Sequence, residues 1–423
     1  MAKGKRGREE IGANEVVSHV SQMPAATLPP DADRRVDLPL LVVSRLFISA
    51  IFMTYPACLS NLIDVWRMSA TEAGIVQGAF SIAFAISLLA ASFACDRIGA
   101  RAVFKLALAA SVVTALLFAF LARSFESAVI CMALVGLAQG GTYTPAIMLV
   151  SANVDPASKG SAVGWMLAGM SGGYVISIVL STTMVAISDY RMAFIACALM
   201  TIVGWISGWL AVRRADDQLS QGTFQGAEYS ASRRRRTGLL TLGYIGHCWE
   251  LFGMWAWIPA FLAAAVLSRG TMSAIELGLW TALVLHISGF FSSFLSGYAA
   301  DHFGAKSVLV FFAAFGAACS FFIGWMVDAN FWLLFFVAAV YGFASIGDSA
   351  VLSSAMTDAV PAQHLGRALG IRSILGIGAG SLSPVAFGAV IDATPLAVSW
   401  GYAFSSLGLG GIIALICAVR LKS

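Results

Sequence analysis

Long apolar runs, separated by short polar segments, dominate the sequence from about residue 38 onward. A membrane-spanning helix needs about 20 consecutive and mostly apolar residues, and twelve runs reach that length. The predicted spans are 38–63, 73–94, 103–121, 128–152, 162–185, 192–212, 238–266, 277–299, 308–326, 332–356, 369–391 and 398–419. This pattern predicts an all-α integral membrane protein with twelve transmembrane helices.

Two polar segments divide the chain. Residues 1–36 mix both charges and have no apolar core of signal-peptide length, which predicts a disordered cytoplasmic tail. Residues 213–236 form the longest polar segment between spans and separate them six from six. We therefore expect a six-helix bundle at 37–212, a cytoplasmic linker at 213–236 and a second six-helix bundle at 237–423.

The composition supports a membrane setting. Of the 423 residues, 59% are hydrophobic and 11% are charged, and the mean hydropathy is +0.83. A soluble domain carries about 25% charged residues, so a soluble chain this apolar could not cover its surface. The seven cysteines lie in or beside apolar runs without metal or redox spacing, and no enzyme motif appears. We expect no metal, no cofactor and no catalytic activity.

The basic residues predict the orientation. Most of the 26 Lys and Arg residues fall in the tail, the linker, the C-terminus and the loops on that side of the membrane. Because basic residues collect on the cytoplasmic side, we expect both termini in the cytoplasm and a multi-pass protein of the cytoplasmic (inner) membrane. The run "RRRR" at 233–236 favours contact with the lipid bilayer over a nucleic-acid site, so no nucleic-acid partner is expected.

Three short sequences recur in the same order at a nearly constant offset. They are "MSATEAG" (68–74) and "MSAIELG" (272–278), "DRIGAR" (96–101) and "DHFGAK" (301–306), and "GSAVG" (160–164) and "GRALG" (366–370). The recurrence predicts an internal duplication of a six-helix unit. Parallel repeats of this kind are related by an axis along the membrane normal.

Length, spans, central linker and duplication together resemble the major facilitator superfamily (MFS). The family carries the signature Gly-x-x-x-Asp-Arg-x-Gly-Arg-Lys/Arg between its second and third spans. The matching residues here are Asp96, Arg97, Gly99 and Arg101 in the first copy, and Gly297, Asp301, Gly304 and Lys306 in the second. Ser92 replaces the first glycine and His302 replaces the second copy's arginine.

The resemblance implies a monomeric secondary transporter of the MFS fold, in which two pseudo-symmetric bundles expose a central cavity to each side in turn. It also implies that the signature residues latch the outward-open state. A carboxylate can cap the N-terminus of a neighbouring helix, where free N–H groups and the helix dipole favour negative charge. The alternative is that these are turn residues combined with positive-inside charges.

The seventh span places three chemically interesting residues on one helical face. His247, Glu250 and Trp257 follow helical spacing in "GYIGHCWELFGMWAWIPAF". Ionisable groups within a span are costly and usually face a cavity or a partner. A carboxyl group among apolar side chains favours its protonated form, so Glu250 is the favoured proton carrier. It could instead be the partner of a basic group, and His247 could be a packing residue.

Further ionisable groups lie in the first, tenth and eleventh spans. Asp348 could pair with Arg372 on the adjacent span or with Arg45 across the two halves, and it is the second candidate proton carrier. An arginine without such a partner would suit an anionic substrate through bidentate hydrogen bonds. A structural ion pair and substrate binding both remain open for these arginines.

Polar but uncharged groups supply the remaining candidates. Gln139 and Tyr143 lie one turn apart in the fourth span, where they could orient a substrate or pack between helices. His286 in the eighth span is a further candidate. The glycines of the fifth and eleventh spans favour close helix packing, because small residues let helices approach. The stretch "GMSGG" in the fifth span resembles the family's antiporter signature only faintly, because it lacks the proline.

These observations favour a secondary transporter that moves a small organic or inorganic anion, coupled to protons. The chain has no phosphate-binding Gly-Lys-Ser loop, so ATP is not the expected energy source. Two alternatives remain open. One is a proton-coupled exporter of amphipathic or cationic compounds, and the other is a non-transporting membrane sensor or scaffold built on a transporter fold.

Overall fold

Helices make up the part of the chain that the computed structural model describes, and these residues include no strand. The described residues are 36–154, 159–215, 231–270, 272–360 and 362–421. The expected tail and most of the expected linker lie outside them. Residues 35–423 belong to one compact unit.

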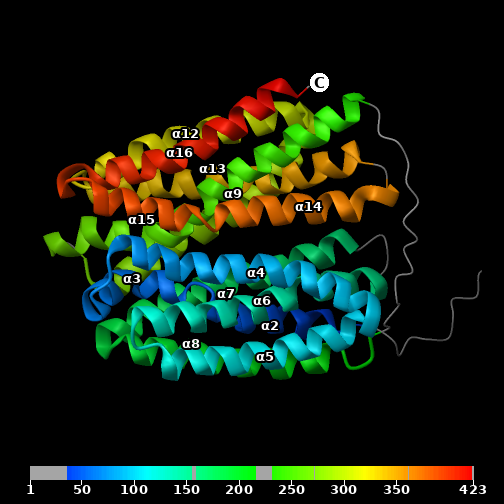
Figure 1. Ribbon diagram of the computed structural model, residues 1–423, viewed down its shortest axis with the longest axis horizontal. Helices are drawn as coiled ribbons and strands as arrows, with labels where there is room; N and C mark the ends of the chain where they lie inside the picture. Colours follow the sequence, from blue (N-terminus) through cyan, green and yellow to red (C-terminus); the bar gives the residue numbers. More distant parts are fainter. Residues whose placement is uncertain (1–35, 155–158, 216–230, 271, 361, 422–423) are drawn as a thin grey trace, which may run out of the picture. The chain divides into compact units, whose positions relative to one another are not determined.

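The first six spans come from the helices up to residue 211. They are α2 (Leu38–Ile48), η1 (Ser49–Ile51), α3 (Thr54–Trp66), α4 (Ala70–Ile98), α5 (Ala100–Leu121), α6 (Phe125–Asn153), α7 (Lys159–Ile187) and α8 (Tyr190–Ala211). The first span combines α2, η1 and α3. Figure 1 draws this half in blue to green.

The second six spans begin after the linker. They are formed by α9 (Ala231–Val266), η2 (Leu267–Arg269), α10 (Ala274–Ala282), the π-helical η3 (Leu283–Ile287), α11 (Ser288–Phe303), α12 (Ala305–Ile323), η4 (Gly324–Met326), α13 (Phe331–Ala359), α14 (Ala362–Gly380), α15 (Ser383–Ala393) and α16 (Leu396–Arg420). The helix α9 already includes the run "RRRR", so the helix of the seventh span begins before the predicted span does.

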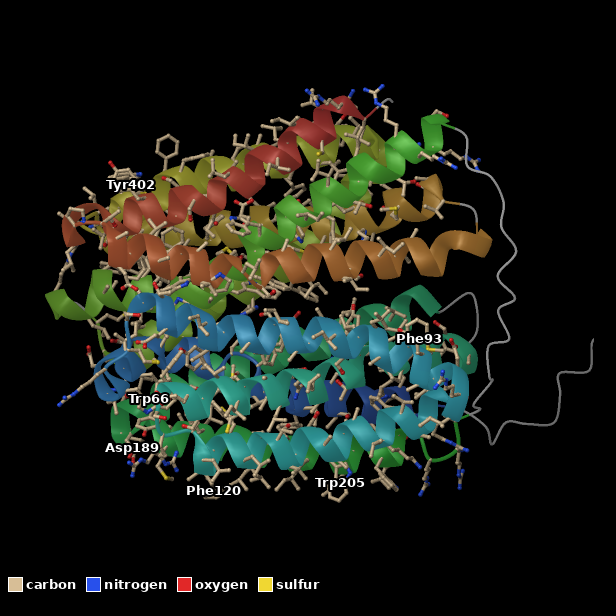
Figure 2. All side chains as sticks on the ribbon, in the orientation of Figure 1. Trp66, Phe93, Phe120, Asp189, Trp205 and Tyr402 are labelled. Carbon is tan, nitrogen blue, oxygen red and sulfur yellow. The ribbon has the colours of Figure 1, made fainter. Side chains whose placement is uncertain are left out.

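Within the described residues, twelve segments are long and apolar enough to cross a membrane, which confirms the expected number of spans. Large apolar side chains remain on their outer faces. Phe93, Phe120 and Tyr402 are all more than half exposed, and Figure 2 labels them. In lipid such side chains need no protein cover, while the helical backbone satisfies its own hydrogen bonds.

The first repeated sequence builds the same helix start in both halves. Ser69 and Glu72 form a capping box at the start of α4, with hydrogen bonds of 2.8 and 3.1 Å. Ser273 and Glu276 repeat it at the start of α10, at 2.9 and 3.2 Å. Each box satisfies backbone N–H groups that a helix start leaves free.

The second repeated sequence builds the same tight turn twice. Gly99 separates α4 from α5 at a φ of 87°, and Gly304 separates α11 from α12 at a φ of 80°. Both angles lie where only glycine is free of steric cost. The glycines of the signature therefore have a backbone role that does not depend on any latch.

The two halves touch where α4 begins and α15 ends, which we call the closed end. An added Cβ on Gly388 would collide with the Ala70 carbonyl, so the backbones approach closely there. Asp392 accepts hydrogen bonds from the backbone N–H groups of Ala70 (2.9 Å) and Thr71 (2.7 Å). A carboxylate from the second half thus caps a helix of the first.

Three spans depart from regular α-helix, which the apolar pattern alone did not predict. The first is interrupted at η1, the eighth at η3, and the eleventh between α14 and α15. Side chains from other helices donate to carbonyls beside two of these breaks. Gln139 Nε2 donates to Ile48 O at 2.8 Å, and Trp257 Nε1 donates to Pro384 O at 3.0 Å. Irregular backbone at membrane depth is tolerated only where the protein supplies such partners.

Candidate substrate and proton sites

Arg45 is a buried cation on α2 that has no carboxylate partner in the described part of the chain. Its Nη1 donates to Thr142 Oγ1 at 2.7 Å, and its Nη2 lies 3.2 Å from Met170 Sδ. Its Nε is buried and has no hydrogen-bond partner among the described residues. The side chain is held in place by neutral groups, so its charge is not neutralised by the protein that surrounds it.

Arg372 on α14 has the same character in the second half. Its guanidinium donates to Leu352 O at 3.0 Å and to Ser353 Oγ at 3.1 Å, and it stacks 4.1 Å from the centroid of the Tyr244 ring. Its Nε is also buried without a partner in the described chain. The Arg372 side chain is only 5% exposed.

Tyr143 on α6 lies near both arginines. Its hydroxyl is within electrostatic range of both Arg45 and Arg372. Tyr174 on α7 is likewise in range of Arg45. A buried charge without an opposite charge is unfavourable, and this region contains two such cations from opposite halves. The arrangement is chemically suited to an anion.

Asp348 on α13 lies next to His247 rather than either arginine. The His247 Nδ1 and Asp348 Oδ1 atoms are 2.7 Å apart, but poorly aligned, because Oδ1 has no partner in hydrogen-bonding geometry among the described residues. Ser349 Oγ lies 2.7 Å from His247 Nε2. The expected pairing of Asp348 with Arg45 or Arg372 is thus absent from this conformation of the described chain.

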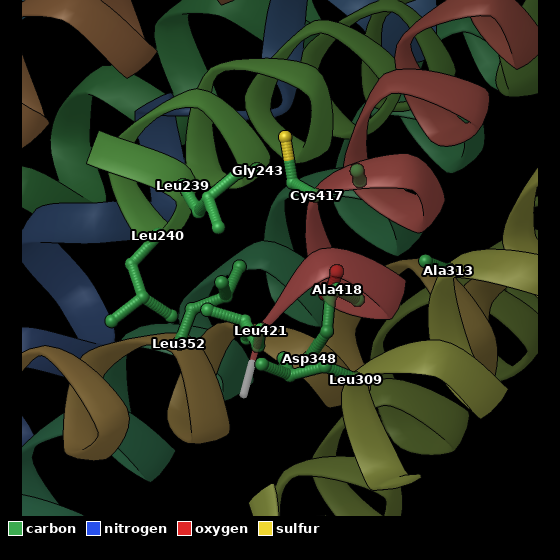
Figure 3. A pocket seen from close by; sticks show the side chains of 11 residues that line it. Leu239, Leu240, Gly243, Leu309, Ala313, Asp348, Leu352, Cys417, Ala418 and Leu421 are labelled. Atoms are coloured by element: carbon green, nitrogen blue, oxygen red, sulfur yellow. The ribbon is translucent and has the colours of Figure 1, made fainter. Parts of the chain in front are cut away.

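A small cavity adjoins Asp348 (Figure 3). Its volume of about 10 Å³ is close to the space that one water molecule needs. Apart from Asp348, the lining side chains are apolar or glycine and come from α9, α12, α13 and α16 together with Leu421, which follows α16. Asp348 is therefore the polar group that a water molecule there would meet.

Glu250 on α9 is surrounded by uncharged partners. Ser320 Oγ donates to its Oε1 at 2.6 Å, and Tyr341 Oη lies 2.6 Å from Ser320 Oγ. Glycines at 316 and 411 leave room for the carboxyl group, because an added Cβ at either would press against it. The group is 5% exposed, and no ion pair fixes its charge in the described structure.

The shared face of the seventh span turns toward the other helices of the second half. His247 contacts α13 and Glu250 contacts α12. Trp257 is 1% exposed and packs 5.0 Å from the Phe387 ring of α15. Trp257 and Gln139 each use their side-chain nitrogen to support an interrupted span, so their observed contacts are structural.

The signature residues lie at the end of the spans opposite the closed end, which we call the loop end. Asp96 and Arg97 are exposed, and neither belongs to an ion pair among the described residues. Arg101 donates to Ala215 O at 3.2 Å. Lys306 and Gly297 are partly buried, and the side chain of Asp301 lies outside the described part.

Several polar residues of these sites were not anticipated from the sequence. They are Thr142, Tyr174, Tyr244, Ser320, Tyr341 and Asp392. Isolated hydroxyl residues are common in apolar spans, so nothing singled them out. A helical-spacing signal existed for Tyr244, which precedes His247 by nearly one turn, and for Thr142, which follows Gln139 by nearly one turn.

The fold and the buried polar groups define a polytopic membrane transporter. A family model described as Major Facilitator Superfamily matches residues 38–285, and the chain belongs to this superfamily. Among the described residues no group of three His, Cys, Asp or Glu side chains could hold a metal ion, and the seven cysteines are buried.

Named transporters are among the relatives. The cis,cis-muconate transport protein of Acinetobacter baylyi is 24% identical over 385 residues, which cover 85% of this chain and 87% of that protein. The hexuronate transporter of Bacillus subtilis is 24% identical over 384 residues, or 84% and 87% of the two chains. A crystal structure of the nucleoside transporter NupG shares the fold, with a TM-score of 0.72 at 14% identity over 91% and 99% of the chains.

Proposed function

We propose that this transporter moves small organic carboxylates, bound through Arg45 and Arg372. The observation that supports this best is the pair of buried guanidinium groups, one in each half, that have no carboxylate partner among the described residues. A substrate carboxylate would supply the missing charge and partners for the unpaired Nε atoms. Arginine is suited to this because its planar fork can bind a carboxylate with two parallel hydrogen bonds.

The chemistry of two relatives supports the same class. The printed names of the muconate and hexuronate transporters are those of carboxylate anions. These proteins are only 24% identical to this chain, so the proposal extends to carboxylates as a class. Inorganic anions are less favoured as substrates, because they would leave the aromatic side chains near Arg45, Tyr143 and Tyr174, without a partner.

We propose proton coupling through the second half, with Glu250 as the favoured carrier and Asp348 as the second. Neutral hydroxyl partners at Glu250 permit a change of charge without breaking an ion pair. Asp348 instead has His247 beside it. A proton at Glu250 would then accompany the substrate during alternating access of the two six-helix halves, predicted at 37–212 and 237–423.

The distribution of basic residues supports a cytoplasmic-membrane location with both termini in the cytoplasm. In that orientation the closed end faces away from the cytoplasm, and we infer that this conformation is inward-facing. A reporter fused to the C-terminus tests the orientation: cytoplasmic activity of the fusion is expected, and activity on the other side would contradict it. The monomeric state and the lack of a nucleic-acid partner stay predictions.

The direct test is uptake by proteoliposomes with an internal pH dye. Wild-type vesicles are given a panel of carboxylates, inorganic anions and lipophilic cations in turn. We expect acidification with one or more carboxylates, and a loss of about 100-fold in uptake for Arg45→Gln, since removing the charge that binds a carboxylate costs several kcal/mol. Arg420→Gln, which changes an exposed arginine at the end of α16, is the matched control.

Other outcomes of the same panel separate the alternatives. A response to cations alone would contradict carboxylate transport and favour the exporter. If Arg45→Gln takes up carboxylates as well as the wild type does, the proposed binding site is contradicted, but carboxylates remain the substrate class. Carboxylate uptake without a pH change would contradict proton coupling and leave the carboxylate substrate and its binding site standing.

A further inference from the structure

Two of the three interrupted spans place an aromatic side chain at the same point. Phe52 follows η1 directly, where the first span is broken. His286 lies within η3, where the eighth span widens to a π-helix. Such interruptions in membrane helices concentrate where a substrate or ion binds. Their meeting point therefore merits a functional explanation.

Four rings from both halves meet there. Tyr174 of the first half lies 4.6 Å from Phe52, 6.0 Å from Trp255 and 5.2 Å from His286, measured between ring centroids. Trp255 lies 6.0 Å from His286. We call Phe52, Tyr174, Trp255 and His286 the aromatic cluster.

The imidazole of His286 has an unsatisfied atom inside this cluster. The residue is 4% exposed, and its Nε2 is buried without a hydrogen-bond partner among the described residues. Buried polar atoms nearly always have partners. A purely apolar contact between the halves would be made better by phenylalanine or leucine, so the nitrogen points to a ligand that supplies the partner.

The aromatic cluster is continuous with the proposed carboxylate site. Met170, which contacts Arg45, lies one turn before Tyr174 on α7, and the Tyr174 hydroxyl is within electrostatic range of Arg45. Arg45 and the four rings are therefore neighbours along α7.

We propose that the aromatic cluster is a subsite for the planar, conjugated body of the carboxylate substrate, with His286 Nε2 hydrogen-bonding a polar substituent on that body. The faces of Tyr174 and Trp255 favour stacking with a flat π-system. The imidazole nitrogen can donate or accept according to its tautomer, so it suits a hydroxyl or a second carboxylate. This inference rests on the proposed carboxylate transport and narrows the substrates to unsaturated or aromatic acids.

Binding measurements with matched anions test the subsite. Purified protein in nanodiscs is titrated calorimetrically with benzoate and cyclohexanecarboxylate, and with cis,cis-muconate and adipate. Each pair has the same charge and nearly the same size, but one member is flat and conjugated. We expect the flat member of at least one pair to bind about tenfold more tightly. Trp255→Leu should reduce that ratio toward one, and Trp165→Leu, an exposed tryptophan on α7, should leave it unchanged.

His286→Phe separates a ligand-binding histidine from a packing one. The variant keeps a ring but removes the unsatisfied nitrogen, so the melting temperature should rise. At the same time the tighter binding of 4-hydroxybenzoate over benzoate should disappear, and His286→Gln should restore part of it. A packing histidine would instead give an unchanged or lower melting temperature and unchanged binding ratios.

The outcomes distinguish this inference from the function on which it rests. Equal affinities within both anion pairs, with binding still dependent on Arg45, would overturn the subsite and leave carboxylate transport standing. Binding of none of these anions, together with no carboxylate uptake by the vesicles, would overturn both. A planar preference that survives Trp255→Leu and a hydroxyl preference that survives His286→Phe would place recognition elsewhere and contradict the subsite.

Discussion

The two halves share their scaffold but not their chemistry. Both repeat a Ser–Glu capping box and a glycine turn at matching places. The first half contributes one buried arginine, whereas the second contributes an acid with neutral partners, an acid beside a histidine, and a second arginine. Capping and turn geometry are thus retained by both copies, while the costly buried charges are specific to each.

The difference suggests a division of labour. A cation without an opposite charge is suited to bind an anion, and both halves supply one. Groups that can gain or lose a proton without breaking an ion pair occur only in the second half among the described candidates, as Glu250 illustrates. We infer that substrate binding depends on both halves and that proton coupling depends on one.

Arg372→Gln is expected to have the largest effect on this comparison. The substitution removes the second half's contribution to anion binding, so the KM for carboxylate uptake should rise by about 30- to 100-fold. Arg372→Lys should recover only part of the loss, because it lacks the bidentate fork and the stack on Tyr244. Uptake kinetics in proteoliposomes provide the measurement. An unchanged KM would mean that the first half binds the substrate alone.

Glu250→Gln should strongly reduce the pH-driven accumulation of substrate but spare substrate exchange. Glutamine fills the same space and can still accept the hydrogen bond from Ser320, but it cannot carry a proton. We expect pH-driven accumulation to fall by about tenfold or more, while exchange of labelled for unlabelled substrate continues. Ser320→Ala, which removes the hydroxyl partner and keeps the carboxyl group, is the matched variant and should remain coupled. Loss of exchange as well would indicate a structural role for Glu250.

Asp348→Asn should act mainly on stability. The change removes the charge beside His247 but keeps an acceptor oxygen there, so the free energy of unfolding should fall by only about 1 kcal/mol, while proton-driven accumulation should persist. Thermal unfolding in detergent measures the first effect and the vesicle assay measures the second. If accumulation is lost while the melting temperature is unchanged, Asp348 and not Glu250 is the proton carrier.

The sequence was sufficient to predict the helices but not the contacts between them. Apolar run length located all twelve spans, because lipid forces each span to be long and helical. The break in the first span could not be predicted, since the contact beside it, from Gln139 to Ile48, comes from another helix. The proximity of Asp348 to His247 rather than Arg372 was hidden for the same reason: it follows from helix rotation, which hydropathy does not encode.

The latch proposal illustrates the same limit and gives the smallest expected effect. Its physics, a carboxylate capping the N-terminus of a neighbouring helix, is present at the closed end through Asp392 and not at Asp96 in this conformation. Asp392→Asn should weaken the cap by about 1 kcal/mol. The equilibrium between the two conformations should therefore shift about fivefold toward the one in which the closed end separates. Asp96→Asn should leave this conformation untouched and disfavour the other one.

The two variants therefore move one equilibrium in opposite directions. Spin labels on Asp64→Cys and Leu396→Cys, exposed positions at the closed end of the two halves, report the separation by electron–electron double resonance. Asp392→Asn should increase the population with longer distances, and Asp96→Asn should decrease it. If Asp96→Asn has no effect while Asp392→Asn does, the signature in the loop acts only as a turn, and the carboxylate of the second half is the single latch between the halves.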